Sequence, residues 1–239
     1  MHQKVFFHLK LLKEKCQKEC KTCKGQGCVN CAAMFDLYEK YAEANIPILY
    51  WKLGLKDLDP NGVGVAEVKK YCSKLDEAYE DGQGLFIFGK NGNGKTLSAC
   101  AIGKVAIRQG RSVRFTFLGE IITSFMNTMY NAEARNKLQD DILNVDFLII
   151  DDIDKAYLSE EGKYVNSIVD TLFRTRTQNC LPTIITANKS MQDILEKSKE
   201  EVFLNSLLSL FKESLLTICF YGGDKRSDLE KQAREKFLK

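Results

Sequence analysis

The sequence lacks a long apolar run, a secretory signal and a strong charge of either sign. No apolar stretch approaches the roughly 20 residues that a membrane-spanning helix needs. Residues 5–7 are apolar, but lysines interrupt the surrounding segment and no small-residue cleavage site follows, which argues against a secretory signal. The net charge is only +3, from 35 basic and 32 acidic residues, so charge alone does not indicate nucleic-acid binding. We therefore expect a cytoplasmic protein.

Internal repeats and low-complexity tracts are also missing, and three regions differ in composition. Residues 1–34 are rich in lysine and cysteine, with seven lysines and two glutamates among the first 31. This basic segment is either a surface for an anionic partner or a solvated, partly helical tail. Residues 35–81 combine helical patterns with turns and are predicted to be a connector. Residues 82–239 are predicted to form the main domain.

Five short apolar runs alternate with helical patterns after residue 84. They are residues 85–88, 113–118, 147–150, 183–186 and 215–220. Strand-length runs rich in β-branched and aromatic residues, separated by helices, are typical of a parallel sheet covered on both faces. The sequence therefore predicts an α/β fold with a five-stranded parallel sheet. A charged helix is predicted over residues 224–239.

A glycine-rich loop follows the first of these runs. Residues 89–96 read Gly-Lys-Asn-Gly-Asn-Gly-Lys-Thr, which fits the pattern G-x-x-x-x-G-K-[ST] between a strand and a helix. Its glycines allow backbone N–H groups to converge on an anion at a helix N-terminus. We expect Lys95 to reach the β- and γ-phosphates of ATP and Thr96 to bind Mg²⁺. The alternative is a glycine-rich turn that matches by chance.

Polar residues follow the third and fourth apolar runs. Asp151, at the carboxyl end of a buried strand, is placed to hold the shell of Mg²⁺. Asp152 is placed to orient or deprotonate an attacking water, although acids here could also cap a helix. Asn188, beyond the fourth run, is expected to contact the γ-phosphate or align water; the alternative is a turn residue that starts the next helix.

The sequence contains nine cysteines, and five of them lie within sixteen residues. Four of the five form two C-x₂-C hooks around a short turn: Cys20, Cys23, Cys28 and Cys31. Four thiolates suit tetrahedral Zn²⁺, whereas an iron–sulfur cluster or free thiols are the alternatives, and Cys16 leaves the ligand set open. The scattered cysteines, predicted to be small buried core residues, are Cys72, Cys100, Cys180 and Cys219.

Together these motifs resemble the AAA+ ATPases of the DnaC and DnaI helicase-loader type, with IstB-like transposition helpers close behind. The resemblance extends over roughly residues 40–226; the matching segments are Ile46-Pro47 and residues 89–96, 144–153 and 182–188. It implies ATP-dependent loading of a hexameric replicative helicase during DNA replication, with single-stranded DNA as a second partner. The IstB-like alternative implies duplex DNA and a transposase. An adaptor that binds ATP with little hydrolysis is a third reading.

The resemblance also implies roles for individual residues. Lys95 and Thr96 correspond to the Walker A motif, Asp151 and Asp152 to Walker B, and Asn188 to sensor 1. Residues 155–176 would be an insertion that contacts DNA, where Tyr164 either stacks on a base or packs in the core. The cysteine-rich segment would bind the helicase, and a full C-terminal lid would be missing. The residues expected to contact the nucleotide are Gly89, Asn91, Gly92, Asn93, Gly94, Lys95, Thr96, Leu97 and Arg226.

The sequence departs from the family pattern at one point. Loaders usually carry an arginine in the helix before the last strand, where it reaches the nucleotide of a neighbouring subunit, but residues 201–213 contain none. Arg174, Arg176 and Arg226 are possible substitutes, and Arg226 is the best placed to contact a γ-phosphate. The alternative for each is an ordinary surface arginine. Activation between subunits of a homo-oligomer is therefore left open.

Overall fold

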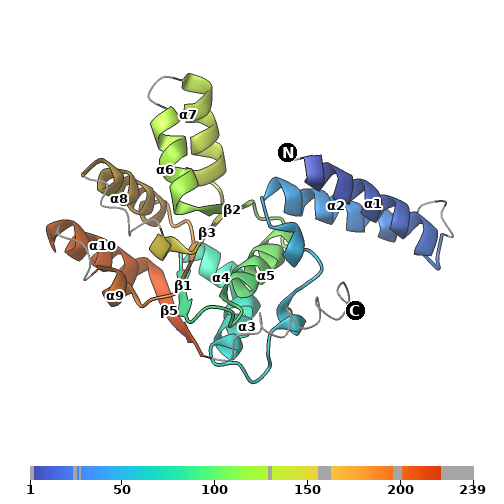
Figure 1. Cartoon of the computed structure of the whole chain (residues 1–239), viewed down its shortest axis with the longest axis horizontal. Helices are drawn as coiled ribbons and strands as arrows, with labels where there is room; N and C mark the ends of the chain where they lie inside the picture. The colour runs from blue at the N-terminus through green and yellow to red at the C-terminus, as the bar shows by residue number, and fades with distance from the viewer. Residues whose placement is uncertain are drawn as a thin grey trace, which may run out of the picture.

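In a computed structural model of the chain, residues 3–23, 26, 28–128, 131–155, 163–195 and 201–221 are described. They form one sheet of five parallel strands in the order β2-β3-β4-β1-β5 (Figure 1). The strands are β1 Gly84–Gly89, β2 Val113–Phe117, β3 Phe147–Asp151, β4 Thr183–Ala187 and β5 Leu215–Phe220. The predicted α/β fold is confirmed, and each predicted strand end lies within one residue of the observed one.

Helices cover both faces of the sheet because alternate side chains of each strand point to opposite sides. Leu85 and Ile87 of β1 pack into one core cluster, whereas Phe86 packs into the other. The first face carries α3 Val65–Ser73, α4 Leu75–Glu80 and α5 Lys95–Arg108. The second carries α6 Leu118–Asn127, α8 Lys163–Gln178 and α10 Glu201–Ser214. Helix α7 Ala132–Leu138 lies against α6, and the π-helical turn η3 Gln139–Leu143 that follows it contacts α8. The short helices η4 Ile153–Lys155 and α9 Met191–Leu195 follow β3 and β4.

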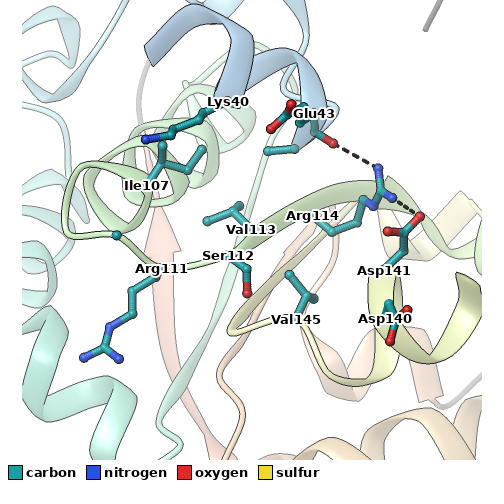
Figure 2. A pocket seen from close by; sticks show the side chains of 12 residues that line it. Lys40, Glu43, Ile107, Arg111, Ser112, Val113, Arg114, Asp140, Asp141 and Val145 are labelled. Atoms are coloured by element: carbon teal, nitrogen blue, oxygen red, sulfur yellow. Dashed lines mark hydrogen bonds and ion pairs between the residues drawn. The ribbon is translucent and has the colours of Figure 1, made fainter. Parts of the chain in front are cut away.

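The N-terminal residues form a helical hairpin beside β2. Helix α1 Gln3–Glu19 and helix α2 Val29–Glu43 lie side by side (Figure 1), and α2 continues across residue 34. Beyond the end of α2, the carbonyl of Ala44 accepts a hydrogen bond of 2.7 Å from the backbone N–H of Phe115. Arg114 donates to the carbonyl of Glu43 at 3.1 Å and pairs with Asp141 (Figure 2). The hairpin is thus fixed to the edge strand of the sheet.

The segment between the hairpin and α3 is fastened to α5. It contains the short helices η1 Ile48–Tyr50 and η2 Leu55–Asp57. Trp51 is buried, donates through Nε1 to the carbonyl of Ile46 at 2.7 Å and stacks on Tyr38 of α2. The buried Lys104 of α5 donates to the carbonyls of Tyr50 and Leu53, and burial lowers its pKa to about 8. The region predicted to be a connector therefore contributes to the core that covers the first face of the sheet.

Arg176 is a core residue, which contradicts its prediction as a substitute arginine finger. Its side chain is 1% exposed. Its guanidinium donates to the Thr183 hydroxyl and to the backbone carbonyls of Ile142, Leu143, Val145 and Pro182 at 2.8–3.1 Å. These bonds join α8 to the segments before β3 and β4. A guanidinium with its donors used inside the fold cannot reach the nucleotide of another subunit.

The scattered cysteines differ in burial. Cys72 and Cys100 are buried as predicted, and Cys219 is half-buried. Cys180 is exposed, so its prediction as a core residue is wrong. It adopts φ 50° just after α8, and the N–H of Leu181 donates to the carbonyl of Arg176 at 2.9 Å. This pattern ends the helix as a Schellman motif does, with Cys180 at its surface.

Several predicted features lie outside the described residues: the charged helix over 224–239, Arg226, and the side chains of Cys16 and Tyr164. Within the described ranges, no helix is long and apolar enough to span a membrane.

Replacing Arg176 with methionine should lower the free energy of unfolding by about 3 kcal/mol or more, because several buried carbonyls lose their donor. Urea denaturation measures the difference. The matched control is Arg174→Met on the same helix, where the side chain is 45% exposed and paired with Asp170, and where a loss below about 1 kcal/mol is expected. Equal losses for both variants would contradict the structural role of Arg176.

Candidate nucleotide-binding site and cysteine cluster

The glycine-rich loop curls between β1 and α5. Gly89 ends β1 at φ 148°, and a Cβ atom there would lie 2.1 Å from the carbonyl oxygen of Phe220 on β5. Gly94 adopts φ 95° immediately before α5. Both positions require glycine. Asn93 donates to the carbonyl of Phe220 at 2.7 Å and ties the loop to β5. The loop therefore leads into the N-terminus of α5, a geometry that suits an anion.

Lys95 lies inside the curl of this loop. The residue is buried, and its ammonium donates to the carbonyls of Gly89 and Lys90, each at 2.8 Å. It also donates to Oδ1 of Asn188 at 3.1 Å. The predicted sensor residue, which directly follows β4, is thus in direct contact with the predicted phosphate-binding lysine.

The carboxylate of Asp151 receives a hydroxyl on each oxygen. Thr96 donates to Oδ2 at 3.2 Å, and Thr186 donates to Oδ1 at 2.6 Å. Asp151 is 6% exposed, so these bonds offset part of the cost of burying its charge. Carboxylate and hydroxyl oxygens beside a phosphate loop are the ligands that Mg²⁺ prefers, so the donor set fits this ion.

The next acid, Asp152, adopts the left-handed backbone conformation, with φ 53°. Its N–H donates to the Thr186 hydroxyl at 3.0 Å. Its Oδ1 lies 3.4 Å from Nδ2 of Asn188. Asp154 accepts from both the backbone N–H and the side-chain Nδ2 of Asn188, at 3.0 and 3.3 Å. Asp152, Asp154 and Asn188 therefore form one hydrogen-bonded group.

The structure brings most of the predicted site residues together. Lys95, Thr96, Asp151, Asp152 and Asn188 meet where β1, β3 and β4 end, as the sequence predicts. The exposed Asn91 lies with Gly92 in the loop, and the half-buried Leu97 lies in the first turn of α5; Arg226 is outside the described residues.

Sequence reasoning missed Thr186 and Asp154. Both are polar residues beside a motif, Thr186 at the end of an apolar strand and Asp154 two residues after the acid pair. That position was the signal by which they could have been found.

The sulfur atoms of Cys20, Cys23, Cys28 and Cys31 all lie within 4.8 Å of one another. Three of the sulfur–sulfur distances, Cys20–Cys28, Cys23–Cys31 and Cys28–Cys31, are 3.6–3.8 Å. Tetrahedral Zn–S bonds of about 2.3 Å place two sulfurs about 3.8 Å apart, whereas a disulfide needs about 2.05 Å. Backbone N–H groups of Cys23 and Thr22 lower the pKa of the Cys20 thiol to about 6 and favour its thiolate. This donor set therefore fits zinc.

Comparison with known proteins gives close relatives over part of the chain. The replicative helicase loader DnaC of Escherichia coli strain K12 is 30% identical over 128 residues, which are 53% of this chain and 51% of that protein. The chain thus spans about half the length of the curated relatives that it matches.

Solved structures resemble about three quarters of the chain. DnaI covers 75% of this chain and 94% of its own, with a TM-score of 0.61 and 22% identity. The replication initiator DnaA bound to AMPPCP and single-stranded DNA covers 78% of this chain and 56% of its own, with a TM-score of 0.56 and 20% identity. At these identities the likeness concerns the fold alone, and it confirms the predicted AAA+ fold.

The family model described as IstB-like ATP binding protein matches residues 68–211, more than half of the chain. That range includes the glycine-rich loop, the acid pair and Asn188. The chain therefore belongs to the family of IstB-like ATP binding proteins.

Proposed function

We propose that the protein is an ATP-dependent loader of a hexameric replicative helicase that acts on single-stranded DNA during replication. The observation that carries this proposal is the 30% identity to the Escherichia coli replicative helicase loader. The cysteine-bearing hairpin on the edge of the sheet supports it, because a loader needs a surface for the helicase beside its ATPase site.

In this proposal the loop and Lys95 bind the phosphates of ATP. Backbone N–H groups of the loop and the N-terminus of α5 face the anion. The Lys95 ammonium exchanges its bonds to the carbonyls of Gly89 and Lys90 for bonds to the β- and γ-phosphates. Thr96 and Asp151 hold Mg²⁺, which supplies positive charge that neutralises the phosphate oxygens.

Hydrolysis is assigned to the residues beyond the ends of β3 and β4. Asp152 orients or deprotonates the attacking water. Asn188, already in contact with Lys95 and with Asp152, senses the γ-phosphate. Helix α10 carries no arginine. Arg226, or the exposed Arg174 on α8, is therefore proposed to supply charge to the nucleotide of a neighbour in a homo-oligomer.

The remaining partners are assigned to two other segments of the chain. Cys20, Cys23, Cys28 and Cys31 hold zinc, and this zinc-bearing segment within residues 1–34 binds the helicase. Residues 155–176 contact single-stranded DNA, with Tyr164 stacking on a base. Residues 35–81 then join the helicase-binding segment to the ATPase domain of residues 82–239, and the hydrogen bonds of Lys104 to the segment around Trp51 support that link.

The second candidate function is that of a transposition helper. The match to the IstB-like family model favours it. Such a helper acts with duplex DNA and a transposase. A third reading, a nucleotide-dependent adaptor with little hydrolysis, is favoured by the lack of arginine in α10.

ATP turnover in the presence of each partner separates these functions. A loader should bind the replicative helicase in a pull-down with ATP and Mg²⁺, and its turnover should change severalfold with single-stranded DNA. Stimulation by duplex DNA without helicase capture would identify a transposition helper. Tight ATP binding with turnover that neither DNA form changes would identify the adaptor.

Replacing Lys95 with alanine should abolish measurable ATP binding. The variant loses at least two charge-assisted bonds of about 1.5–3 kcal/mol each, which corresponds to about 100-fold or more in affinity. Isothermal titration with ATP and Mg²⁺ measures the loss. Lys90→Ala is the matched control, because that side chain is exposed on the same loop and should leave affinity nearly unchanged. Tight ATP binding by Lys95→Ala would contradict the assignment of residues 89–96 as a phosphate-binding loop.

Replacing Cys23 with serine should remove most of the zinc from the purified protein and weaken helicase capture, while ATP binding stays intact. Loss of one thiolate from four lowers metal affinity steeply. Metal content measured by mass spectrometry, together with the pull-down, checks both effects. The control is Cys180→Ser, an exposed cysteine outside the cluster. Unchanged zinc in the Cys23 variant would reject this ligand set.

A further inference from the structure

Strand β4 ends between the glycine-rich loop and the acid pair. In the sheet it pairs with β1 on one side and with β3 on the other. Thr186 lies opposite Ile87 of β1. On the other side Ile185 lies opposite Ile150, so Thr186 is level with the next residue of β3, Asp151. Residue 186 therefore lies between the strand that leads into the glycine-rich loop and the strand that ends in the acid pair.

Both hydrogen bonds of the Thr186 hydroxyl go to the acid pair. It donates to Oδ1 of Asp151 at 2.6 Å, a length typical of a bond to a charged oxygen. It accepts from the backbone N–H of Asp152 at 3.0 Å. Thr186 is fully buried, so its hydroxyl depends on these protein partners rather than on bulk water.

These two bonds constrain different properties of the two acids. On Asp151, the hydroxyls of Thr186 and Thr96 hold opposite oxygens and so fix the orientation of the carboxylate. On Asp152, the bond supports the backbone at φ 53°, a conformation that non-glycine residues adopt only a few per cent of the time. One hydroxyl therefore directs both side chains.

Packing alone does not explain a threonine here. The neighbours Ile184, Ile185 and Ala187 on β4 are apolar, and valine has nearly the shape of threonine. The other threonine of the strand, Thr183, uses its hydroxyl to accept from the buried Arg176. A buried hydroxyl is favourable only when bonded, so its presence at position 186 points to the acids that it contacts.

We propose that Thr186 is a positioning residue of the magnesium site: its hydroxyl orients Asp151 toward the Mg²⁺ shell and fixes the bend that presents Asp152 to the attacking water. This inference rests on the proposed ATP and Mg²⁺ site and adds a residue to it. Thr186 acts through the two acids, so its loss raises the Mg²⁺ requirement and slows turnover without weakening metal-free nucleotide binding.

The test compares three full-length variants with the wild type. Thr186→Val removes the hydroxyl and keeps the shape, Thr186→Ser keeps the hydroxyl, and Thr217→Val makes the same exchange at an exposed position on β5. A fluorescent ATP analogue is titrated in EDTA and again in Mg²⁺. In a second assay Mg²⁺ is titrated at fixed ATP with turnover as the readout. Thermal melting shows whether each variant folds.

Thr186→Val should raise the Mg²⁺ concentration for half-maximal turnover about 10- to 100-fold, the usual effect of losing a group that orients a metal ligand. Its binding of the analogue in EDTA should stay within about twofold of the wild type, because Lys95 and the loop are intact. Thr186→Ser should restore the wild-type Mg²⁺ requirement to within a few-fold. Thr217→Val should behave as the wild type.

Two results would overturn the role of Thr186: an unchanged Mg²⁺ requirement in Thr186→Val, or an equal loss of binding with and without Mg²⁺, which would mean a structural role only. If the wild type itself bound no ATP in either condition, the proposed function would fail, and this inference with it. Thr186→Ala supplies a second hydroxyl-free variant, judged by the same criteria, if Thr186→Val does not fold.

Discussion

Parallel pairing of β4 with both β1 and β3 is the constraint on which the site depends. It brings three strand ends to one edge of the sheet, although the residues that meet there are up to 93 apart in the chain, as in the bond between Lys95 and Asn188. A buried carboxylate at such an edge requires donors, and two hydroxyls supply them to Asp151. The order of the strands thus brings the glycine-rich loop and Asp151 together.

Local signals explain why much of this arrangement was predictable from the sequence. Apolar runs of strand length located all five strands, and the glycines of the loop located the turn at Gly89 and Gly94. Contacts between distant segments were not predictable in this way. The position of Thr186 at the end of an apolar strand marks it as a candidate, but its bonds to the acids span 34 and 35 residues, so the sequence beside it does not identify its partners. The same holds for the burial of Arg176, because its guanidinium bonds to carbonyls that lie 31 to 34 residues earlier in the chain.

A second set of contacts joins the cysteine-bearing hairpin to the candidate nucleotide site. The hairpin reaches the sheet edge through Ala44 and Arg114, and the following segment is held on α5 by Lys104. Helix α5 begins at the glycine-rich loop. A partner that moved the hairpin would therefore also displace α5, the helix that begins at the glycine-rich loop. The connection runs through packed side chains and backbone hydrogen bonds rather than through a flexible tether.

The position of Trp51 has a practical consequence, because it is the only tryptophan in the chain. Its indole lies at the joint between hairpin and core, stacked on Tyr38 of α2 and bonded to Ile46. The tryptophan fluorescence of the protein therefore originates at this joint. Its emission wavelength and quenching report on the docking of the hairpin without any added label, and they do so independently of whether ATP is hydrolysed.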